Sequence, residues 1–329
     1  MNYSALKRAV KIAVKARRPV FVWGGPGIGK SSVIHQVSME LEGFQFKDTR
    51  AVHYDPVDFR GIPKVVDQFT KWFSPDFLPK TGKGIWFLDE LNAAPQAVQA
   101  ALYQLILDRK VGDYTLPEGW VIVAAGNRDI DRAIVNRMSS PLCNRFAGHY
   151  ELEVDAAEWK VWAIEADIIP ELVAFFSWRP QLLYGFDPAR TDKAFTTPRT
   201  VEFLSDLIKA GLEPEKDFDM MSACIGQGTA TELTGFYRIY RSLPDLDEAL
   251  KNPDTVKLPR ENIGAMYALV GALARKATKK TMPALVVLAK RIGSDFGVLL
   301  IKDAITANKS VAETGSYVEW AAENQSVMI

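Results

Sequence analysis

A glycine-rich turn is the part of the chain best suited to bind a phosphate. Residues 24–31 read GGPGIGKS and fit the pattern G-x-x-x-x-G-K-[ST]. Glycines allow backbone N–H groups to surround phosphate oxygens, and a helix that begins near Lys30 points its positive end at the same anion. We expect Lys30 to contact the outer phosphates and Ser31 to bind Mg²⁺. The alternative is a tight strand-to-helix turn with an incidental lysine. The predicted nucleotide-binding residues are Gly25, Pro26, Gly27, Ile28, Gly29, Lys30, Ser31 and Ser32, of which Ser32 suits the metal less well than Ser31.

A pair of acids is the second chemical feature. Asp89 and Glu90 end an apolar run, IWFL at residues 85–88, that is typical of a buried strand. An acid at the end of such a strand could bind Mg²⁺, and a second acid could polarise a water molecule for attack on the γ-phosphate. By itself the pair is more typical of a solvated turn, but its place after the glycine-rich turn favours catalysis. We therefore predict Asp89 as a metal ligand and Glu90 as a catalytic residue.

The segments around these residues alternate between strand-like and helix-like patterns, which predicts an α/β fold with a parallel sheet flanked by helices. After about Asp155 strand patterns become scarce and helical patterns dominate. Residues 242–262 have the composition of an exposed connector. The predicted strands are residues 19–24, 84–90, 120–127 and 148–154, and the predicted parts are an α/β domain (1–155), a helical lid (156–243) and a C-terminal helical extension (244–329).

The overall composition restricts the classes of function. Lys and Arg number 40, as do Asp and Glu, so the formal net charge is zero, which argues against binding nucleic acid by bulk charge. Cys143 and Cys224 have no metal-site spacing and are expected to be reduced thiols. The N-terminal segment lacks the apolar core of a signal peptide, and no apolar run reaches the about 18 residues of a membrane span. We expect a soluble, cytoplasmic protein.

The order of the motifs resembles that of a known family. GGPGIGKSS at 24–32, the stretch 84–108, VIVAAGNRD at 121–129 and CNRF at 143–146 follow the order seen in AAA+ ATPases. Over about residues 5–215 the chain is most similar to the MoxR-type group, in the clade with an insert around the second helix. The resemblance implies a P-loop NTPase core followed by an all-α lid, with ATP and Mg²⁺ as cofactors.

The same resemblance implies roles for four further residues. Asn127 matches sensor 1, which would hydrogen-bond the γ-phosphate or the attacking water. Arg145 matches the arginine finger, which reaches the nucleotide of a neighbouring subunit and stabilises the charge of the transition state. Arg137 could be a second inter-subunit arginine or a surface salt-bridge partner. Arg199 lies where the family places sensor 2, at the start of a lid helix that Pro198 would begin.

Two segments look like insertions into this core. Residues 54–84 contain several aromatic residues among prolines and charges, and residues 108–119 have the pattern of a hairpin. In the family the first insert faces the pore or a partner. The alternative for both segments is aromatic packing on the core. The aromatic residues are Phe59, Phe69, Trp72, Phe73 and Phe77, while Asp55, Asp58 and Arg60 have no role that the sequence assigns.

Together these features favour an ATP-driven machine that forms a closed, hexameric ring and remodels a protein client. The resemblance implies a partner that carries a von Willebrand factor A domain. A nucleic-acid motor or loader is the alternative; it would need basic stripes, and the local basic runs at 7–18 and 272–280 are more typical of solvated helix faces. A nucleotide-gated switch with little turnover is a third possibility, against which Glu90 argues.

Overall fold

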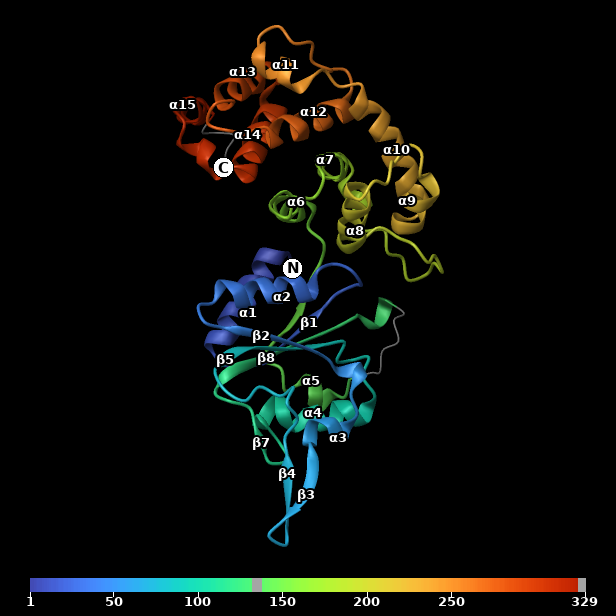
Figure 1. Ribbon diagram of the computed structural model, residues 1–329, viewed down its shortest axis with the longest axis vertical. Coiled ribbons are helices and arrows are strands. Elements are labelled where there is room, and N and C mark those ends of the chain that lie inside the picture. The colour runs from blue at the N-terminus through green and yellow to red at the C-terminus, as the bar shows by residue number, and fades with distance from the viewer. Residues whose placement is uncertain (132–137, 325–329) are drawn as a thin grey trace. The chain divides into compact units, whose positions relative to one another are not determined.

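The computed structural model describes residues 1–131 and 138–324, and the chain forms two compact units. The first comprises Met1–Val154 with Phe186–Arg190, and the second comprises Asp155–Gly185 with Thr191–Ile329. The first unit contains the sheet and the second is helical (Figure 1). The further division of the helical part into a lid and an extension stays a prediction.

A five-stranded, fully parallel sheet forms the centre of the first unit, in the order β2-β5-β8-β1-β9. The central strands β5 and β8 are almost continuously buried, as expected when helices cover both faces. Strand β8 lies between β1 and β5, so the ends of all three strands meet at one edge. The strands are β1 (Val20–Trp23), β2 (Gln45–Arg50), β5 (Lys83–Asp89), β8 (Gly119–Gly126) and β9 (His149–Glu151), which confirms the four strands predicted from the sequence.

Helices cover the two faces of this sheet (Figure 1). On one face lie α1 (Tyr3–Lys15) and α2 (Lys30–Glu40). On the other, Leu102 and Leu105 of α4 pack in one apolar cluster with strand residues such as Trp86. Helix α4 spans Gln96–Asp108. Short helices in this unit are α3 (Pro56–Arg60), α5 (Ser140–Cys143), η1 (Ala51–His53) and η2 (Asp129–Asp131).

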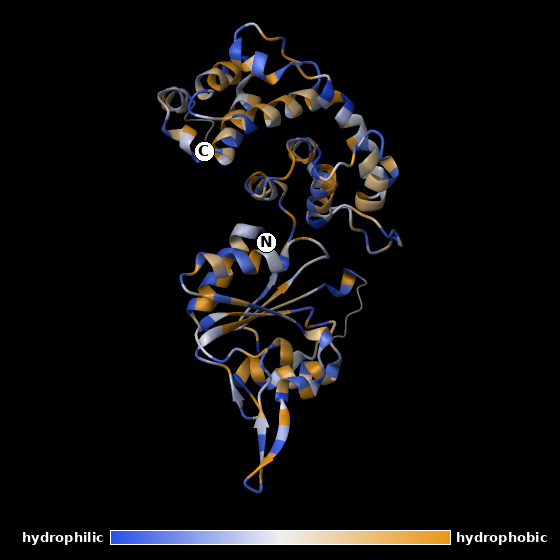
Figure 2. Cartoon of the chain, in the orientation of Figure 1, coloured by the Kyte–Doolittle hydropathy of each residue, from blue (hydrophilic) through white to orange (hydrophobic). Residues whose placement is uncertain are grey.

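The first insert is an antiparallel ribbon of β3 (Ile62–Val66) and β4 (Phe69–Phe73) that extends away from the sheet. Four of its apolar side chains are largely exposed: Ile62 67%, Val65 79%, Phe69 72% and Phe73 48%. Figure 2 shows hydrophobic segments of the ribbon interrupted by hydrophilic ones. At its base, Gly61 has φ 90°, and a Cβ there would lie 2.2 Å from the carbonyl oxygen of Phe73, so only glycine fits.

The aromatic residues of this insert divide between the two interpretations made from the sequence. Phe59 is fully buried and Phe77 packs against it, with ring centroids 5.7 Å apart. Phe69 and Phe73 are exposed on the ribbon, and Trp72 is 36% exposed.

The second insert is the predicted hairpin. It consists of β6 (Lys110–Val111) and β7 (Tyr114–Thr115). Asp113 at its turn accepts a hydrogen bond of 3.3 Å from the backbone N–H of Trp72.

The second unit is built from helices around its own apolar core. A buried ion pair of 2.7 Å between Lys160 and Asp303 joins helices far apart in the chain, α6 and α14. Residues 242–262, expected to be a connector, contain a short helix whose Ala249 is buried. The elements are α6 (Ala156–Glu165), α7 (Pro170–Trp178), η3 (Pro180–Leu182), α8 (Pro198–Lys209), α9 (Phe218–Ile225), α10 (Gln227–Arg241), α11 (Leu246–Lys251), α12 (Ile263–Arg275), α13 (Met282–Ile292), α14 (Ser294–Ala307), η4 (Lys309–Glu313) and α15 (Gly315–Glu323). Among residues 1–131 and 138–324, no helix combines the length and hydrophobicity needed to span a bilayer.

Candidate functional site

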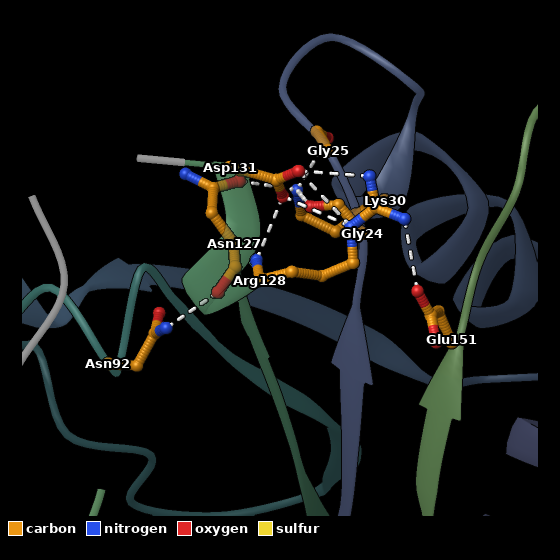
Figure 3. A network of polar contacts seen from close by, with 8 residues as sticks. All are labelled: Gly24, Gly25, Lys30, Asn92, Asn127, Arg128, Asp131 and Glu151. Atoms are coloured by element: carbon orange, nitrogen blue, oxygen red, sulfur yellow. Dashed lines mark hydrogen bonds and ion pairs between the residues drawn. The ribbon is translucent and has the colours of Figure 1, made fainter. Parts of the chain in front are cut away.

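The glycine-rich turn joins β1 to α2 and places Lys30 at the first position of that helix. Gly27 and Gly29 have φ angles of 72° and 90°, a left-handed conformation that favours glycine. The Lys30 ammonium donates hydrogen bonds to the carbonyl oxygens of Gly24 (2.7 Å) and Gly25 (2.9 Å) and to Oδ1 of Asn127 (3.0 Å) (Figure 3). A cationic group at a helix N-terminus suits an anion such as a phosphate.

Asn127 links this turn to the loop that carries the acids. It directly follows β8, and its own carbonyl oxygen accepts a hydrogen bond of 2.7 Å from Nδ2 of Asn92. Asn92 is almost completely buried, and a Cβ on Gly126 would lie 2.1 Å from its Oδ1, so this approach requires glycine. Asn92 was not singled out from the sequence because its partner lies on a different loop.

The acid pair occupies the predicted end of β5. Oδ1 of Asp89 accepts a hydrogen bond of 2.9 Å from the backbone N–H of Glu90. Glu90 has φ 54°, a left-handed conformation that costs a non-glycine residue about 1–2 kcal/mol. The next N–H, of Leu91, donates to Ala125 of β8 at 3.0 Å and fixes the turn to the sheet. Non-glycine residues with such strained backbone conformations cluster at functional sites.

The charge state of Asp89 is set by its surroundings. Burial raises the pKa of its carboxyl above the ordinary value, because the charged form loses hydration. The backbone N–H of Glu90 and the ammonium of Lys30 oppose this rise, whereas the negative charges of Asp48 and Glu90 add to it. Asp89 therefore lies in a position where a bound cation would favour the ionised form.

Arg128 braces the same edge and was also missed by the sequence analysis. Its guanidinium forms a 2.9 Å ion pair with the buried carboxylate of Asp131 and a 3.0 Å ion pair with Glu151 of β9 (Figure 3). These contacts raise the pKa of Arg128 above its already high ordinary value, first through the hydrogen bonds to Asp131. The arginine therefore holds the residues after β8 against β9.

Arg145 follows α5 and has a different environment from Arg128. Its guanidinium carbon lies 3.3 Å from the centroid of the Tyr103 ring. Helix α5 is tied to the end of β1 through His149, whose Nδ1 accepts from the Trp23 indole N–H at 3.1 Å. The other ring nitrogen, Nε2, then carries the proton and donates to the carbonyl oxygen of Cys143 at 2.9 Å.

The other predicted residues are Ser31, Ser32, Arg199 and Arg137. Ser31 is partly buried and Ser32 exposed in the first turn of α2. Arg199 is exposed at the start of α8 in the second unit, where Thr197 caps the helix by accepting from the Thr200 N–H. Arg137 lies outside the described residues. Their predicted roles stay predictions.

Comparisons with known proteins give a family and distant structural neighbours. Residues 20–153 match the ATPase family associated with various cellular activities (AAA). A RuvB variant from Thermotoga maritima is 20% identical over 76% of this chain and 75% of that chain, with a TM-score of 0.41. NtrX from Brucella abortus is 12% identical over 98% of this chain and 67% of that chain, with a TM-score of 0.42. No curated protein matches the sequence.

The matched residues include the glycine-rich turn, the acid pair and Asn127, which meet at one edge of the parallel sheet. Residues 20–153 are an AAA P-loop ATPase domain, and the protein is an ATPase.

The Asp89→Asn variant should melt at a higher temperature than the wild type at pH 7 without nucleotide. Since the folded-state pKa of Asp89 is raised, stability linked to this group is present at low pH and is lost as pH rises through that pKa. Asparagine avoids the loss and can still accept the Glu90 N–H. The gain should shrink as the pH falls toward about 4, the ordinary range of a carboxyl, in thermal melts at both pH values.

The matched control is Asp108→Asn, at an exposed position at the end of α4, which should change the melting temperature little at either pH. A lower melting temperature for Asp89→Asn than for the wild type at pH 7 would contradict the assigned environment.

Proposed function

We propose that the protein is a MoxR-type AAA+ ATPase that assembles into a hexameric ring and uses ATP hydrolysis to remodel a protein client, together with a partner that carries a von Willebrand factor A domain. The observation that carries this proposal is the exposed apolar ribbon β3–β4 on the ATPase domain. The similarity of the motifs to the MoxR-type group supports the partner.

Within each subunit, the glycine-rich turn binds ATP. Backbone N–H groups of Gly25, Gly27, Ile28 and Gly29 surround the phosphates. Lys30 exchanges its contacts with carbonyl oxygens for contacts with the outer phosphates. Ser31 and Asp89 hold Mg²⁺, which when bound neutralises phosphate charge. The residues fit this ion, because Mg²⁺ prefers oxygen ligands and the Asp89 carboxyl is partly buried at the end of β5, where a bound cation would favour its charged form.

Two residues act on the attacking water. Glu90, whose backbone is strained, polarises the water as a general base. Asn127 orients the water or the γ-phosphate, because its Oδ1 already lies beside Lys30. Arg199 reports the state of the nucleotide to the helical lid.

Hydrolysis is completed by a neighbouring subunit. Arg145 forms no ion pair with a carboxylate within residues 1–131 and 138–324, so its charge is available to an anion outside its own subunit. An arginine supplied in trans to a phosphoryl transfer raises the rate by about 10³–10⁵-fold. This requirement is the physical reason for a closed ring, in which each subunit has a neighbour.

The ribbon supplies a surface for the client. A cross-strand pair of lysines, Lys64 and Lys71, lies between the apolar pairs Ile62–Phe73 and Val66–Phe69. Like charges directly opposite each other destabilise an isolated ribbon, and an acidic, partly apolar protein segment would relieve this repulsion. Exposed apolar side chains rimmed by charge are typical of protein interaction sites.

Mixing two inactive variants tests the trans arrangement. Glu90→Gln should lower ATP hydrolysis by about 10²–10⁴-fold and retain ATP binding. Arg145→Ala should lower hydrolysis by about 10³-fold, also with binding retained. A mixture should regain hydrolysis, because Glu90→Gln subunits donate Arg145 to sites in Arg145→Ala subunits that keep Glu90. Phosphate release measures the rate.

The control is Arg18→Ala, which removes an exposed arginine between α1 and β1 and should leave ATP hydrolysis unchanged. If both variants bind ATP but no mixture regains activity, Arg145 does not act between subunits.

Capture of the partner tests the client surface. A tagged Glu90→Gln subunit, purified from its own cells with ATP, should retain a protein that carries a von Willebrand factor A domain. Val65→Ser with Phe69→Ser should lower this capture by about tenfold or more, because interface aromatic side chains dominate binding. Mass spectrometry of the retained proteins is the measurement.

The control is Leu107→Ser, which removes an apolar side chain, 51% exposed, outside the ribbon and should not change the capture. Capture of nucleic acid in place of such a protein, or capture that the ribbon variant leaves unchanged, would contradict the proposal.

A further inference from the structure

We propose that Tyr103 is a positioning residue for Arg145: its ring holds the guanidinium face-on and aims the remaining donors outward, toward the nucleotide of the neighbouring subunit. The contact that carries this inference is the 3.3 Å separation between the guanidinium carbon of Arg145 and the ring centroid of Tyr103. The inference rests on the proposed role of Arg145 between subunits and adds the group that orients it.

The two side chains are carried by elements that the core fixes independently. Tyr103 lies on α4 beside Leu102, which is fully buried, and it packs against the apolar cluster of the first unit. Arg145 is followed by Phe146, which is 6% exposed and meets the ring of Phe21 edge-on at 5.3 Å and 81°. The backbone N–H of Arg145 donates a hydrogen bond of 3.1 Å to the carbonyl oxygen of Leu142. The backbone positions on both sides of the contact are therefore set by packing.

The chemistry of the contact suits an arginine that must bind a phosphate. A guanidinium that stacks on a ring contacts the ring through its planar face. Its N–H donors lie in that plane and stay available for a bidentate contact with an anion. A carboxylate at the same place would occupy those donors and neutralise the charge. The Arg145 Nε atom is buried and has no acceptor within residues 1–131 and 138–324, so a hydrogen bond does not replace the ring as the orienting contact.

Arg128, in the same domain, shows the alternative in which an arginine is paired with carboxylates. Arg128 pairs with two carboxylates, those of Asp131 and Glu151, and braces its own subunit. Arg145 is held by an aromatic ring and retains its charge for another partner. Tyr103 thus orients Arg145 without competing for phosphate.

The test places a Tyr103 substitution on one side of the subunit interface at a time. In mixtures of Glu90→Gln and Arg145→Ala subunits, only the Glu90→Gln subunit donates the arginine. Tyr103→Leu in that subunit should lower the regained ATP hydrolysis by about tenfold, the scale of a desolvated stacking contact. Tyr103→Leu in the Arg145→Ala subunit should change it by less than about twofold, because no guanidinium is stacked there.

Two further variants separate positioning from folding. Tyr103→Phe keeps the ring and should restore most of the regained hydrolysis. Gln104→Leu changes an exposed neighbour on α4 and should have no effect on either side. Thermal melts and binding of a fluorescent ATP analogue establish that each variant is folded.

Equal losses on both sides, or no loss on the donor side, would overturn the role of Tyr103 and leave the role of Arg145 intact. Absence of any regained activity before Tyr103 is changed would overturn the trans arrangement itself, and with it this inference.

Discussion

The ammonium group of Lys30 is the contact on which the arrangement of the site depends. A cation at the end of a parallel sheet must find acceptors, because an unpaired charge away from water is costly. Two of its acceptors are carbonyl oxygens of its own turn, and another is Oδ1 of Asn127, which directly follows β8, the strand next to β1. The group therefore holds the turn and the end of β8 in a fixed relation.

The strand order of the sheet allows these contacts to Lys30 and to the acid loop. Because β8 lies between β1 and β5, Asn127 reaches Lys30 on one side while the acid loop joins β8 on the other, through Leu91 and Asn92. The glycine at position 126 permits the close approach of Asn92. The glycine-rich turn, the acid loop and Asn127 are thus connected by a few hydrogen bonds across three strands.

The sequence predicted the local features of the chain and missed those that join distant segments. The glycine-rich turn, the acids after an apolar strand and the capped helix at Pro198 depend on neighbouring residues, so pattern and spacing suffice. Asn92 and Tyr103 contact partners 35 or more residues away, and nothing in their sequence neighbourhood identifies those partners. The exposure of the ribbon and the short helix at residues 246–251 also depend on tertiary packing, which aromatic content and prolines do not specify.

The most direct test of this account is the affinity of the Lys30→Gln variant for a fluorescent ATP analogue, measured by titration. Glutamine can still donate to the carbonyl oxygens of the turn but brings no charge to the phosphates. The account predicts an affinity lower by about a hundredfold, the scale of a few kcal/mol for charged hydrogen bonds, with Lys71→Gln on the ribbon unchanged. An unchanged affinity for Lys30→Gln would show that the nucleotide binds elsewhere and would contradict the central claim.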